Sequence, residues 1–380
     1  MLDVFADARH QGNQLLVLVD EDGQLSHDRR LAITREVGFA ETAFICSTPV
    51  AAPGQIDVRI YTPEYEVPFA GHPSLGLAHT ARRLLQDGTA DTSGDKLRLN
   101  VLGAELGRGQ VAVSQTDDTV WWMEQPQPVF LTPFPLTLLV RLVRAAPEVV
   151  DVETLKFVQH VVDGKVPLVS RTPGEGAEEV DSTDVLVPEI STGLPYLLIP
   201  VRGADALATA ADSLLCGDAE ACDHLKSLGL DADGHPLCLT TSLYFYHFAS
   251  PPSSSSTGAG SVAPDSSTSF VNEIHVRMFC FEQGKWVEDA ATGSAAGCLC
   301  ALLSTVSELS SSSRPPSWPT GTLLPAHIKQ GHVAMGRPST ILVDGSAPQS
   351  LRSQSTDYDN AWVVRVGGRV QHLAEGKWGL

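Results

Sequence analysis

The chain has 380 residues, of which 43% are hydrophobic and 19% charged, a composition typical of a globular protein long enough for two domains. Its 45 acidic residues outnumber its 26 basic ones, and the net charge of -19 argues against nucleic acid or an anionic membrane as a partner. No apolar run approaches the roughly 20 residues needed to span a bilayer, so no membrane partner is expected.

The N-terminal residues and the cysteines indicate the compartment in which the protein is expected. The N-terminus lacks the basic segment and apolar core of a signal peptide. The 7 cysteines are scattered along the chain and form no CxxC pair. An odd and scattered set is typical of reduced thiols rather than of a disulfide framework or a zinc site. We therefore expect a cytoplasmic protein without a metal site.

The first elements are expected to be two short strands, Leu2 to Phe5 and Leu15 to Val19, joined by a turn that contains Gly12 and Asn13. The backbone amides of this turn can face a ligand, although a plain hairpin turn explains the two residues equally well. A helix is expected over His27 to Glu36, and a glycine just after it is placed to end it.

The segment FAETAFIC, from Phe39 to Cys46, is rich in β-forming residues and predicts a buried strand. With the two-residue period of a strand, Glu41 shares a face with Phe39, Ala43 and Ile45, and is a lone carboxylate on an otherwise apolar face. Loss of water raises the pKa of a carboxyl group, which is how a glutamate becomes a proton carrier near neutral pH. The alternative is that this face meets solvent or that an arginine pairs with Glu41.

A degenerate internal repeat organises the chain. The stretch VRIYTPEYEVPFAGHPSLGLAHTARRLL, residues 58–85, returns as VRMFCFEQGKWVEDAATGSAAGCLCALL, residues 276–303. Each copy predicts a strand, a turn, and a long apolar helix entered through a glycine, Gly71 or Gly293. Free backbone amides make a helix start an anion site, so two related copies predict helix starts that face one ligand. The alternative is a duplicated scaffold without a ligand.

Both predicted helix starts carry polar side chains. His72 precedes a proline in the first turn of the first helix, and Asp289, Thr292 and Ser294 can cap the second by accepting from its N–H groups. An exposed histidine and simple capping would explain these residues without chemistry. Together with Glu41, however, they favour metal-free proton transfer beside a substrate carboxylate.

Several catalytic classes lack their motifs. The sequence contains no Gly-rich phosphate loop followed by Lys and Ser or Thr, no GxGxxG after a strand, no GxSxG, and no His/Cys cluster with metal spacing. We therefore expect no cofactor.

The rest of the chain predicts two mostly antiparallel, strand-rich halves, each with one buried helix. A helical segment is expected over 133–162, and two low-complexity stretches, 249–269 and 307–320, are interpreted as flexible surface insertions. An acidic cluster at 175–181 is interpreted as a solvated loop. Further strands are predicted at 56–61, 96–102, 110–114 and 120–123, and within 186–202, 237–248, 327–343 and 362–366; further helices are predicted at 205–215 and 219–228.

Six motifs occur in order across nearly the whole chain: GN, ETAF, YTPEYEVPFAGHPSLG, STGLPYLLIP, VEDAATGSAAG and QGHVAMGRPS. In this the chain resembles the PhzF family of phenazine biosynthesis-like isomerases, which share the diaminopimelate epimerase fold. The resemblance implies an α+β fold with two pseudo-symmetric β-barrel-like domains, residues 1–128 and 129–380. Each domain would wrap around a central α-helix, with the site in the cleft between them.

The resemblance also implies roles for single residues. Glu41, in ETAF, would shuttle a proton on a small anionic metabolite, as in the family's isomerisation of trans-2,3-dihydro-3-hydroxyanthranilate, with His72 and Asp289 as further catalytic residues. The residues implied in substrate binding are Gly71, Ser74, Thr292, Gly293 and Ser294. A homodimer without cofactor is implied as well. Two departures from the family pattern are Ala290, where a proline is usual, and the long insertions.

Two alternatives remain open at this point. The same fold hosts cofactor-independent amino-acid epimerases, which use two opposed bases, usually a cysteine at each central helix start. Here those positions carry His72 and Ser294, while Cys298 and Cys300 lie inside the second helix. The other alternative is a catalytically silent protein that binds small acids. Nothing in the sequence specifies a cyclic over an aliphatic substrate.

Overall fold

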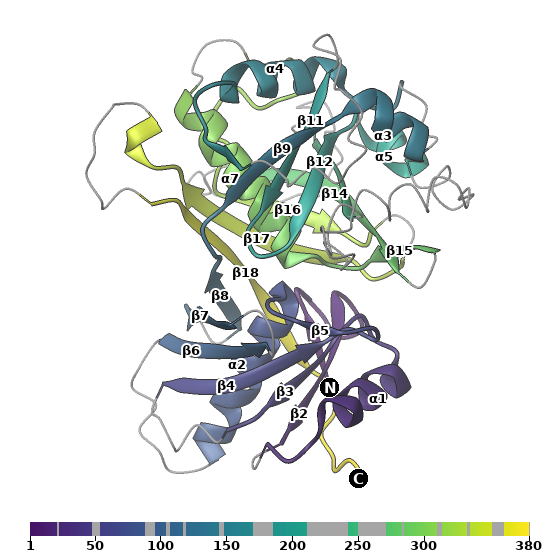
Figure 1. The fold of residues 1–380 in the computed structure, drawn as a ribbon, viewed down its shortest axis with the longest axis vertical. Coiled ribbons are helices and arrows are strands. Elements are labelled where there is room, and N and C mark those ends of the chain that lie inside the picture. The colour runs from purple at the N-terminus through teal and green to yellow at the C-terminus, as the bar shows by residue number, and fades with distance from the viewer. Residues whose placement is uncertain are drawn as a thin grey trace, which may run out of the picture.

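The computed structural model describes residues 1–20, 23–47, 54–87, 96–103, 107–116, 119–143, 148–169, 185–210, 242–249, 271–282, 285–309, 314–332, 335–351 and 361–379. It has an α+β architecture in two halves stacked along the long axis, each with a curled sheet around one central helix (Figure 1). The α+β class and the two-half organisation predicted from the sequence are therefore confirmed.

The sheet of the first half closes into a ring. Hydrogen-bonded pairing runs β1-β2-β3-β4-β6-β7-β8-β18 and then from β18 back to β1. The ring surrounds α2, and the short strand β5 pairs with β4 beside it. The elements are β1 (Leu2–Val4), β2 (Asn13–Val19), α1 (His27–Val37), β3 (Thr42–Ile45), β4 (Gln55–Tyr61), β5 (Glu66–Val67), α2 (Gly71–Asp87), β6 (Lys96–Gly103), β7 (Gly107–Gln115), β8 (Val120–Glu124) and β18 (Val363–His372).

The second half curls around α7 in the strand order β9-β11-β12-β13-β14-β16-β17-β18, with β10 beside β9 and β15 beside β14. Its elements are β9 (Val129–Pro135), α3 (Leu136–Val143), α4 (Val152–Val162), β10 (Leu168–Val169), β11 (Leu186–Ser191), β12 (Pro195–Pro200), α5 (Ala204–Thr209), β13 (Ser242–Phe248), β14 (Asn272–Glu282), β15 (Lys285–Asp289), α7 (Gly293–Leu309), β16 (Ala326–Gln330), β17 (Ser339–Ser346) and a 3-10 turn, η1 (Gln349–Leu351).

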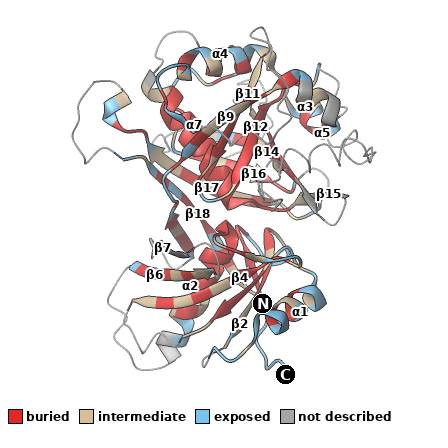
Figure 2. Cartoon of the chain, in the orientation of Figure 1, coloured by how far each residue is buried: buried red, intermediate tan, exposed pale blue. Residues whose placement is uncertain are grey.

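The two central helices are buried because of their sequences. Every residue of α7 from Gly293 to Val306 is buried, as expected for a helix that is apolar on all sides. The first two turns of α2 are buried in the same way. Figure 2 shows the buried residues concentrated on these helices and on the strand surfaces that surround them.

The last strand belongs to both halves. Residues 363–367 of β18 pair with β17, residues 365–369 pair with β8, and residues 370–372 pair with β1. The chain therefore returns to the first half before it ends, and β18 joins the two sheets (Figure 1). The division at residue 128 stays a prediction.

Two expectations need correction. The segment expected to be helical from residue 133 begins in strand β9 and turns into helix only at Leu136. The stretch 307–320 is not simply a surface insertion: its first residues continue α7, and Trp318 is buried between Phe157 and Phe248. The large apolar side chain of Trp318 therefore packs into the core although the residues around it are rich in Ser and Pro. The expected helix at 219–228, the acidic cluster and most of the first insertion lie outside the described residues.

The internal repeat is visible as a matched ion pair in each half. Arg59 on β4 donates to both carboxylate oxygens of Glu66 on β5, at 2.7 and 3.0 Å. Arg277 on β14 donates to both oxygens of Glu288 on β15, at 2.8 Å each, and a further nitrogen of the guanidinium donates to the carbonyl of Ala208. These pairs fix the two short strands that lead into the central helices.

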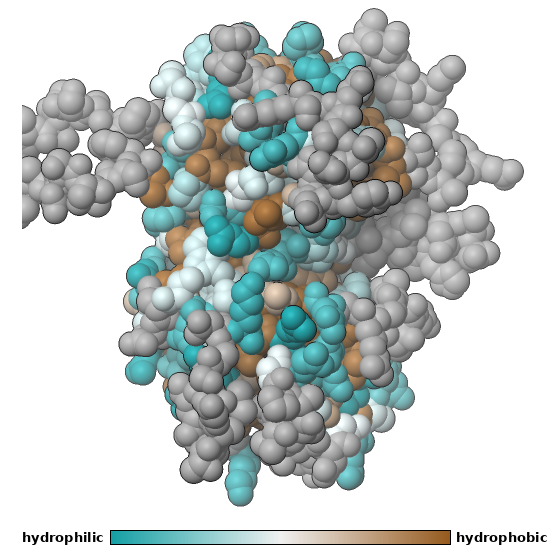
Figure 3. Space-filling view, turned by 90° about the vertical axis from the view of Figure 1, so that its left-hand side faces the viewer, coloured by the Kyte–Doolittle hydropathy of each residue, from teal (hydrophilic) through white to brown (hydrophobic). Residues whose placement is uncertain are grey.

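No helix in the described part of the chain is both long and apolar enough to cross a membrane. On the face seen in Figure 3, hydrophobic residues form separate groups among hydrophilic ones.

We expect Arg277→Met to lower the free energy of unfolding by about 3–5 kcal/mol, because the substitution leaves the mostly buried Glu288 carboxylate without its partner. Urea denaturation measures the loss. The matched control is Arg83→Met, whose pair with Glu375 is exposed and whose loss is expected to cost less than about 1 kcal/mol. Equal stability of the two variants would contradict a structural role for the buried pair.

Candidate active site

The two central helices meet at their N-terminal ends. A Cβ atom added to Gly71 would lie 2.8 Å from the Cα of Gly293 and 2.8 Å from the backbone nitrogen of Ser294. These distances leave no room for a side chain, so glycine is required for the approach. The positive ends of both helix dipoles therefore converge on one point between the halves.

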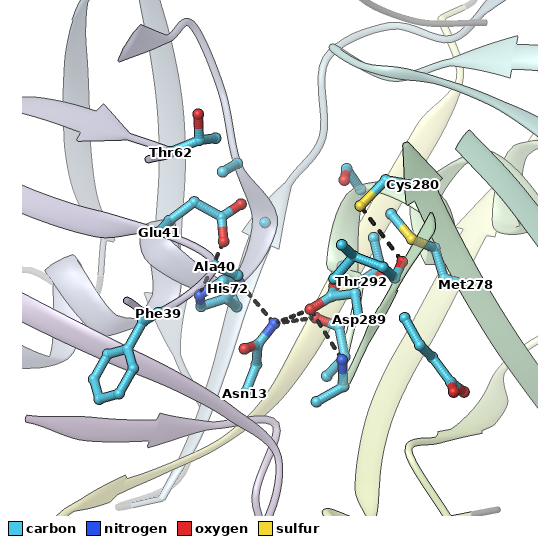
Figure 4. Close-up of a pocket in the computed structure, with 18 of the residues that line it drawn as sticks. Asn13, Phe39, Ala40, Glu41, Thr62, His72, Met278, Cys280, Asp289 and Thr292 are labelled. Carbon is cyan, nitrogen blue, oxygen red and sulfur yellow. Dashed lines mark hydrogen bonds and ion pairs between the residues drawn. The ribbon is translucent and has the colours of Figure 1, made fainter. Parts of the chain in front are cut away.

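A cavity of about 360 Å³ lies at this convergence and is lined from both halves. Figure 4 shows Glu41 and His72 on the side of the first half, Asp289 and Thr292 on the side of the second, and Asn13 between them. Gly71, Gly293 and Ser294 also line the cavity, so the structure brings together seven of the eight residues singled out from the sequence.

Ser74 is the exception. Its side chain is fully buried, and its hydroxyl donates to the carbonyl of Ala70 at 2.8 Å, inside the helix. It does not line the cavity, so the geometry does not support its expected part in substrate binding, which stays a prediction. The sequence pattern placed Ser74 in the correct turn of the helix but could not show which way it points.

Glu41 and His72 face each other at the cavity. Glu41 lies one residue before β3, on the side of that strand that faces α2, and its Oε2 lies 3.7 Å from Nε2 of His72. The Glu41 side chain keeps 19% of its area exposed, whereas His72 is almost completely buried. The buried Nε2 of His72 has no hydrogen-bond partner, so it is a polar atom available to a ligand.

Burial sets the charge state of His72. Loss of water lowers the pKa of its imidazole from 6.5 to about 3, and a backbone hydrogen bond with Gln14 opposes the shift only in part. His72 is therefore neutral at physiological pH. In the Glu41–His72 pair, the imidazole brings no positive charge to the carboxyl group.

Asn13 connects the two helix starts. Its side-chain amide donates to Oδ1 of Asp289 at 2.7 Å and to the carbonyl of Ala291 at 3.0 Å, and lies 3.3 Å from Nδ1 of His72. Asn13 is the first residue of β2, directly after Gly12. Gly12 has φ of 63°, and a Cβ there would lie 2.2 Å from the carbonyl oxygen of Val4, so the turn requires glycine.

Asp289, the last residue of β15, is held by the residues that lead into α7. It accepts from the backbone of Ala290 at 2.9 Å and from the hydroxyl of Thr292 at 2.6 Å. Gln330 accepts from the backbone nitrogen of Thr292 at 3.0 Å and donates to the carbonyl of Asp289 at 2.8 Å. Both polar groups of Thr292 are thus used within the protein, which makes it a positioning residue for Asp289 and does not support the expected substrate contact.

Ser294 also has a partner within the site. Its hydroxyl lies 2.7 Å from that of Tyr196, whose pKa burial raises well above its usual value, so Tyr196 stays a neutral hydroxyl. The hydroxyl of Ser294 is therefore not the helix cap that the sequence suggested.

Arg337, from the second half, lines one side of the cavity and binds residues of the first half. Its guanidinium donates to Oδ1 of the buried Asp3 at 2.7 Å and to the carbonyls of Gln11 at 2.9 Å and Gly12 at 2.9 Å. The turn that presents Asn13 is thereby held by a residue of the second half.

Sequence reasoning missed the side chains of Asn13, Gln330 and Arg337. All three stand in motifs that were noticed, GN and QGHVAMGRPS, but as residues of turns and strands rather than of the site. Within the described residues, no group of three or more His, Cys, Asp or Glu side chains is placed to hold a metal ion.

The pairing registers show which residues of the two halves occupy equivalent positions. Thr42 pairs with Tyr61 in the first half, as Leu243 pairs with Phe279 in the second, so the residues before them, Glu41 and Ser242, are equivalent. The repeat equates His72 with Ser294 in the same way. Leu16 on β2 pairs with Thr42, as Leu197 on β12 pairs with Leu243. Counting back three residues along each strand makes Asn13 equivalent to Leu194.

Comparison with known proteins agrees with this architecture. Residues 2–134 match the profile of the family described as phenazine biosynthesis-like protein. An uncharacterized isomerase of Mesorhizobium japonicum is 26% identical over 99% of this chain and 97% of its own length. The trans-2,3-dihydro-3-hydroxyanthranilate isomerase of Pseudomonas aeruginosa is 33% identical, over 34% of this chain and 42% of that protein. A predicted epimerase from Pseudomonas aeruginosa has the same fold, with a TM-score of 0.54, 24% identity, and coverage of 98% of this chain and 95% of that chain.

We expect Gly71→Ala to lower the free energy of unfolding by about 1–3 kcal/mol, because the added methyl group forces the helix starts apart. The control is Gly321→Ala, since no atom lies within 4 Å of the Cβ position there. Urea denaturation of both variants tests the prediction. Two variants as stable as the wild type would show that the contact is not tight in solution.

The lowered pKa of His72 predicts a pH dependence of stability. Between about pH 6.5 and pH 3 the unfolded chain binds a proton at this residue that the folded chain does not, so stability is full above that range and falls as the pH decreases through it. The slope from this residue is at most about 1.4 kcal/mol per pH unit. His72→Gln should therefore lose less stability than the wild type between pH 7.5 and pH 5, measured by urea denaturation. Identical losses would show that His72 is not buried as a neutral group.

Proposed function

We propose that this chain, which belongs to the phenazine biosynthesis-like (PhzF) family of isomerases, moves a proton between two atoms of a small carboxylate-bearing metabolite with Glu41 as its single acid/base. That the chain is an isomerase with this fold is inferred from its membership of the family. The substrate type and the role of Glu41 are proposed from the site.

The observation that carries the proposal is the asymmetry of the cavity. An epimerase that inverts a stereocentre needs an acid and a base on opposite faces of one carbon. In this pseudo-symmetric cavity, the positions equivalent to Glu41 and His72 carry Ser242 and Ser294. A serine hydroxyl titrates far above neutral pH and does not exchange protons readily without a base. A group suited to carry the proton thus stands at Glu41, and its counterpart position lacks one.

A mechanism follows from these positions. The substrate carboxylate binds at the converging helix starts, where the amides of Gly71, Gly293 and Ser294 and both dipoles favour negative charge. Ionised Glu41 removes a proton from one carbon, and the electron pair is delocalised into the adjoining unsaturated system. Protonated Glu41, whose partly exposed carboxyl group can exchange its proton with water, then delivers a proton to a second carbon. The ionised carboxylate of Glu41 is then restored, so atoms and charge balance.

His72 and Asp289 have complementary parts in this mechanism. The unpartnered Nε2 of the neutral His72 meets a hydroxyl or amino group of the substrate next to Glu41. The carboxylate of Asp289 lies across the cavity and, fixed by Asn13 and Thr292, attracts a substrate ammonium group. Because His72 and Asp289 are held in place by surrounding side chains, they would orient the substrate without moving themselves.

We expect the enzyme to incorporate solvent deuterium into a substrate carbon in deuterated buffer, detected by mass spectrometry on trans-2,3-dihydro-3-hydroxyanthranilate and on a panel of amino and hydroxy acids. Glu41→Gln should lower the rate by at least about a hundredfold, the usual contribution of a positioned acid/base. The control, Glu36→Gln on the exposed side of α1, should leave the rate unchanged.

Three results would decide against the proposal. Incorporation by Glu41→Gln at the wild-type rate would remove Glu41 as the proton carrier. Interconversion of the two enantiomers of an amino acid, seen by chiral chromatography, would establish an epimerase. Binding of the panel without any exchange would indicate a catalytically silent protein.

A further inference from the structure

The cavity has a chemically distinct wall on the side of the second half. We call it the second-half wall and define it by Leu194, Met278, Cys280 and Val287. Met278 and Cys280 are two residues apart on β14 and therefore point to the same side of the sheet. Cys280 pairs with Val287 on β15, so these side chains form a continuous surface.

This wall is apolar and well supported from behind. Met278 is buried, and the partly buried Leu194 and Cys280 pack against the main core. The thiol of Cys280 lies 3.7 Å from the carbonyl of Val287, so its S–H is directed toward the backbone of the neighbouring strand. In Figure 4, Met278 and Cys280 stand opposite Glu41, across the cavity.

Two positions of the second-half wall have polar equivalents in the first half. Asn13 stands where the second half has Leu194, and Thr62 stands where it has Cys280. Both of these polar residues line the cavity as well. At these two positions, the duplicated scaffold presents hydrogen-bonding groups to the cavity in the first half and hydrocarbon and a thiol in the second.

The charges around the cavity admit one carboxylate. Among the described lining residues the acidic side chains are Glu41, Glu288 and Asp289, and the cationic one is Arg337. Two nitrogens of the Arg337 guanidinium already donate to Asp3 and to the carbonyls of Gln11 and Gly12. The converging helix starts are then the favoured place for an anionic group, and a second carboxylate would meet the like charge of Glu41, Glu288 or Asp289.

We infer that the substrate is a monocarboxylate with an apolar body, a ring or a branched or unsaturated chain, whose face opposite Glu41 packs on the second-half wall. This inference rests on the proposed function for the position of the reacting face and adds the substrate class to it. Sulfur atoms make favourable contacts with aromatic and unsaturated groups, and burial of the apolar face supplies binding free energy that the single anion site does not. The wall selects against dicarboxylates and against acids with a second charged group at the far end.

Alkylation of Cys280 tests the inference without any turnover. The thiol is partly exposed and lines the cavity, so iodoacetamide should label it, and peptide mass spectrometry distinguishes it from the other cysteines. We expect benzoate, cyclohexanecarboxylate or 4-methylpentanoate to slow labelling of Cys280 at least fivefold at concentrations where succinate has no effect. Labelling of Cys46, which lies outside the cavity, is the control and should not change. Equal protection by succinate, or no protection by any of the three apolar acids, would overturn the inference.

Affinity measurements give a second test. Met278→Gln keeps the length of the side chain but adds an amide. It should weaken the affinity for cyclohexanecarboxylate roughly fivefold, measured by calorimetry. The affinity for acetate, which reaches only the helix starts, should not change. Equal weakening of both ligands, or of neither, would count against the wall.

The results of these experiments show whether the proton carrier or the second-half wall is wrong, because the two can fail independently. If Glu41→Gln still exchanges protons but the apolar acids protect Cys280, the proton carrier is wrong and the wall stands. If deuterium enters a dicarboxylate through Glu41, the proton carrier stands and the wall is wrong.

Discussion

The close contact between Gly71 and Gly293 is the constraint on which the rest of the structure depends. Two helix starts with like partial charges are brought together, which is unfavourable unless an anion or a fixed dipole stands between them. The protein offsets this by burying both helices in one continuous hydrophobic core and by bridging their starts with Asn13 and Asp289. What remains between them is a cavity at which the partial charges of two helix starts favour a negative group.

Around this point a symmetric scaffold carries an asymmetric set of side chains. The two halves keep the same path of strand, short strand and helix, and each keeps its Arg–Glu pair, because these features hold the helix start in place. The side chains that face the cavity have diverged instead. Glu41, His72 and Asn13 in the first half face Ser242, Ser294 and Leu194 at the equivalent positions. A duplicated fold thus has the symmetry that a two-base epimerase uses, with side chains that suit a single proton carrier.

The site depends on contacts between residues that lie far apart in the sequence. Arg337 reaches from the loop between β16 and β17 to the turn before β2, and β18 passes from the second sheet into the first. The two halves are therefore held at a defined distance by buried polar contacts and by a shared strand. In the proposed function, this arrangement would keep Glu41 within reach of a substrate bound at the helix starts, because a displacement of one half would separate the carboxyl group from the helix starts.

Local sequence determined the helix starts at Gly71 and Gly293, the end of α1, most strands, and the side of β3 on which Glu41 lies, since each depends on periodicity, capping or glycine geometry within a few residues. The repeat and the ordered motifs determined the two-half architecture and most of the cavity residues. Tertiary structure alone decided that Ser74 turns away, that Thr292 serves Asp289, that Trp318 is part of a core, and that Asn13 and Arg337 belong to the site. These outcomes depend on partners hundreds of residues away or on the packing around a side chain, and a pattern of neighbours along the chain carries no information about either.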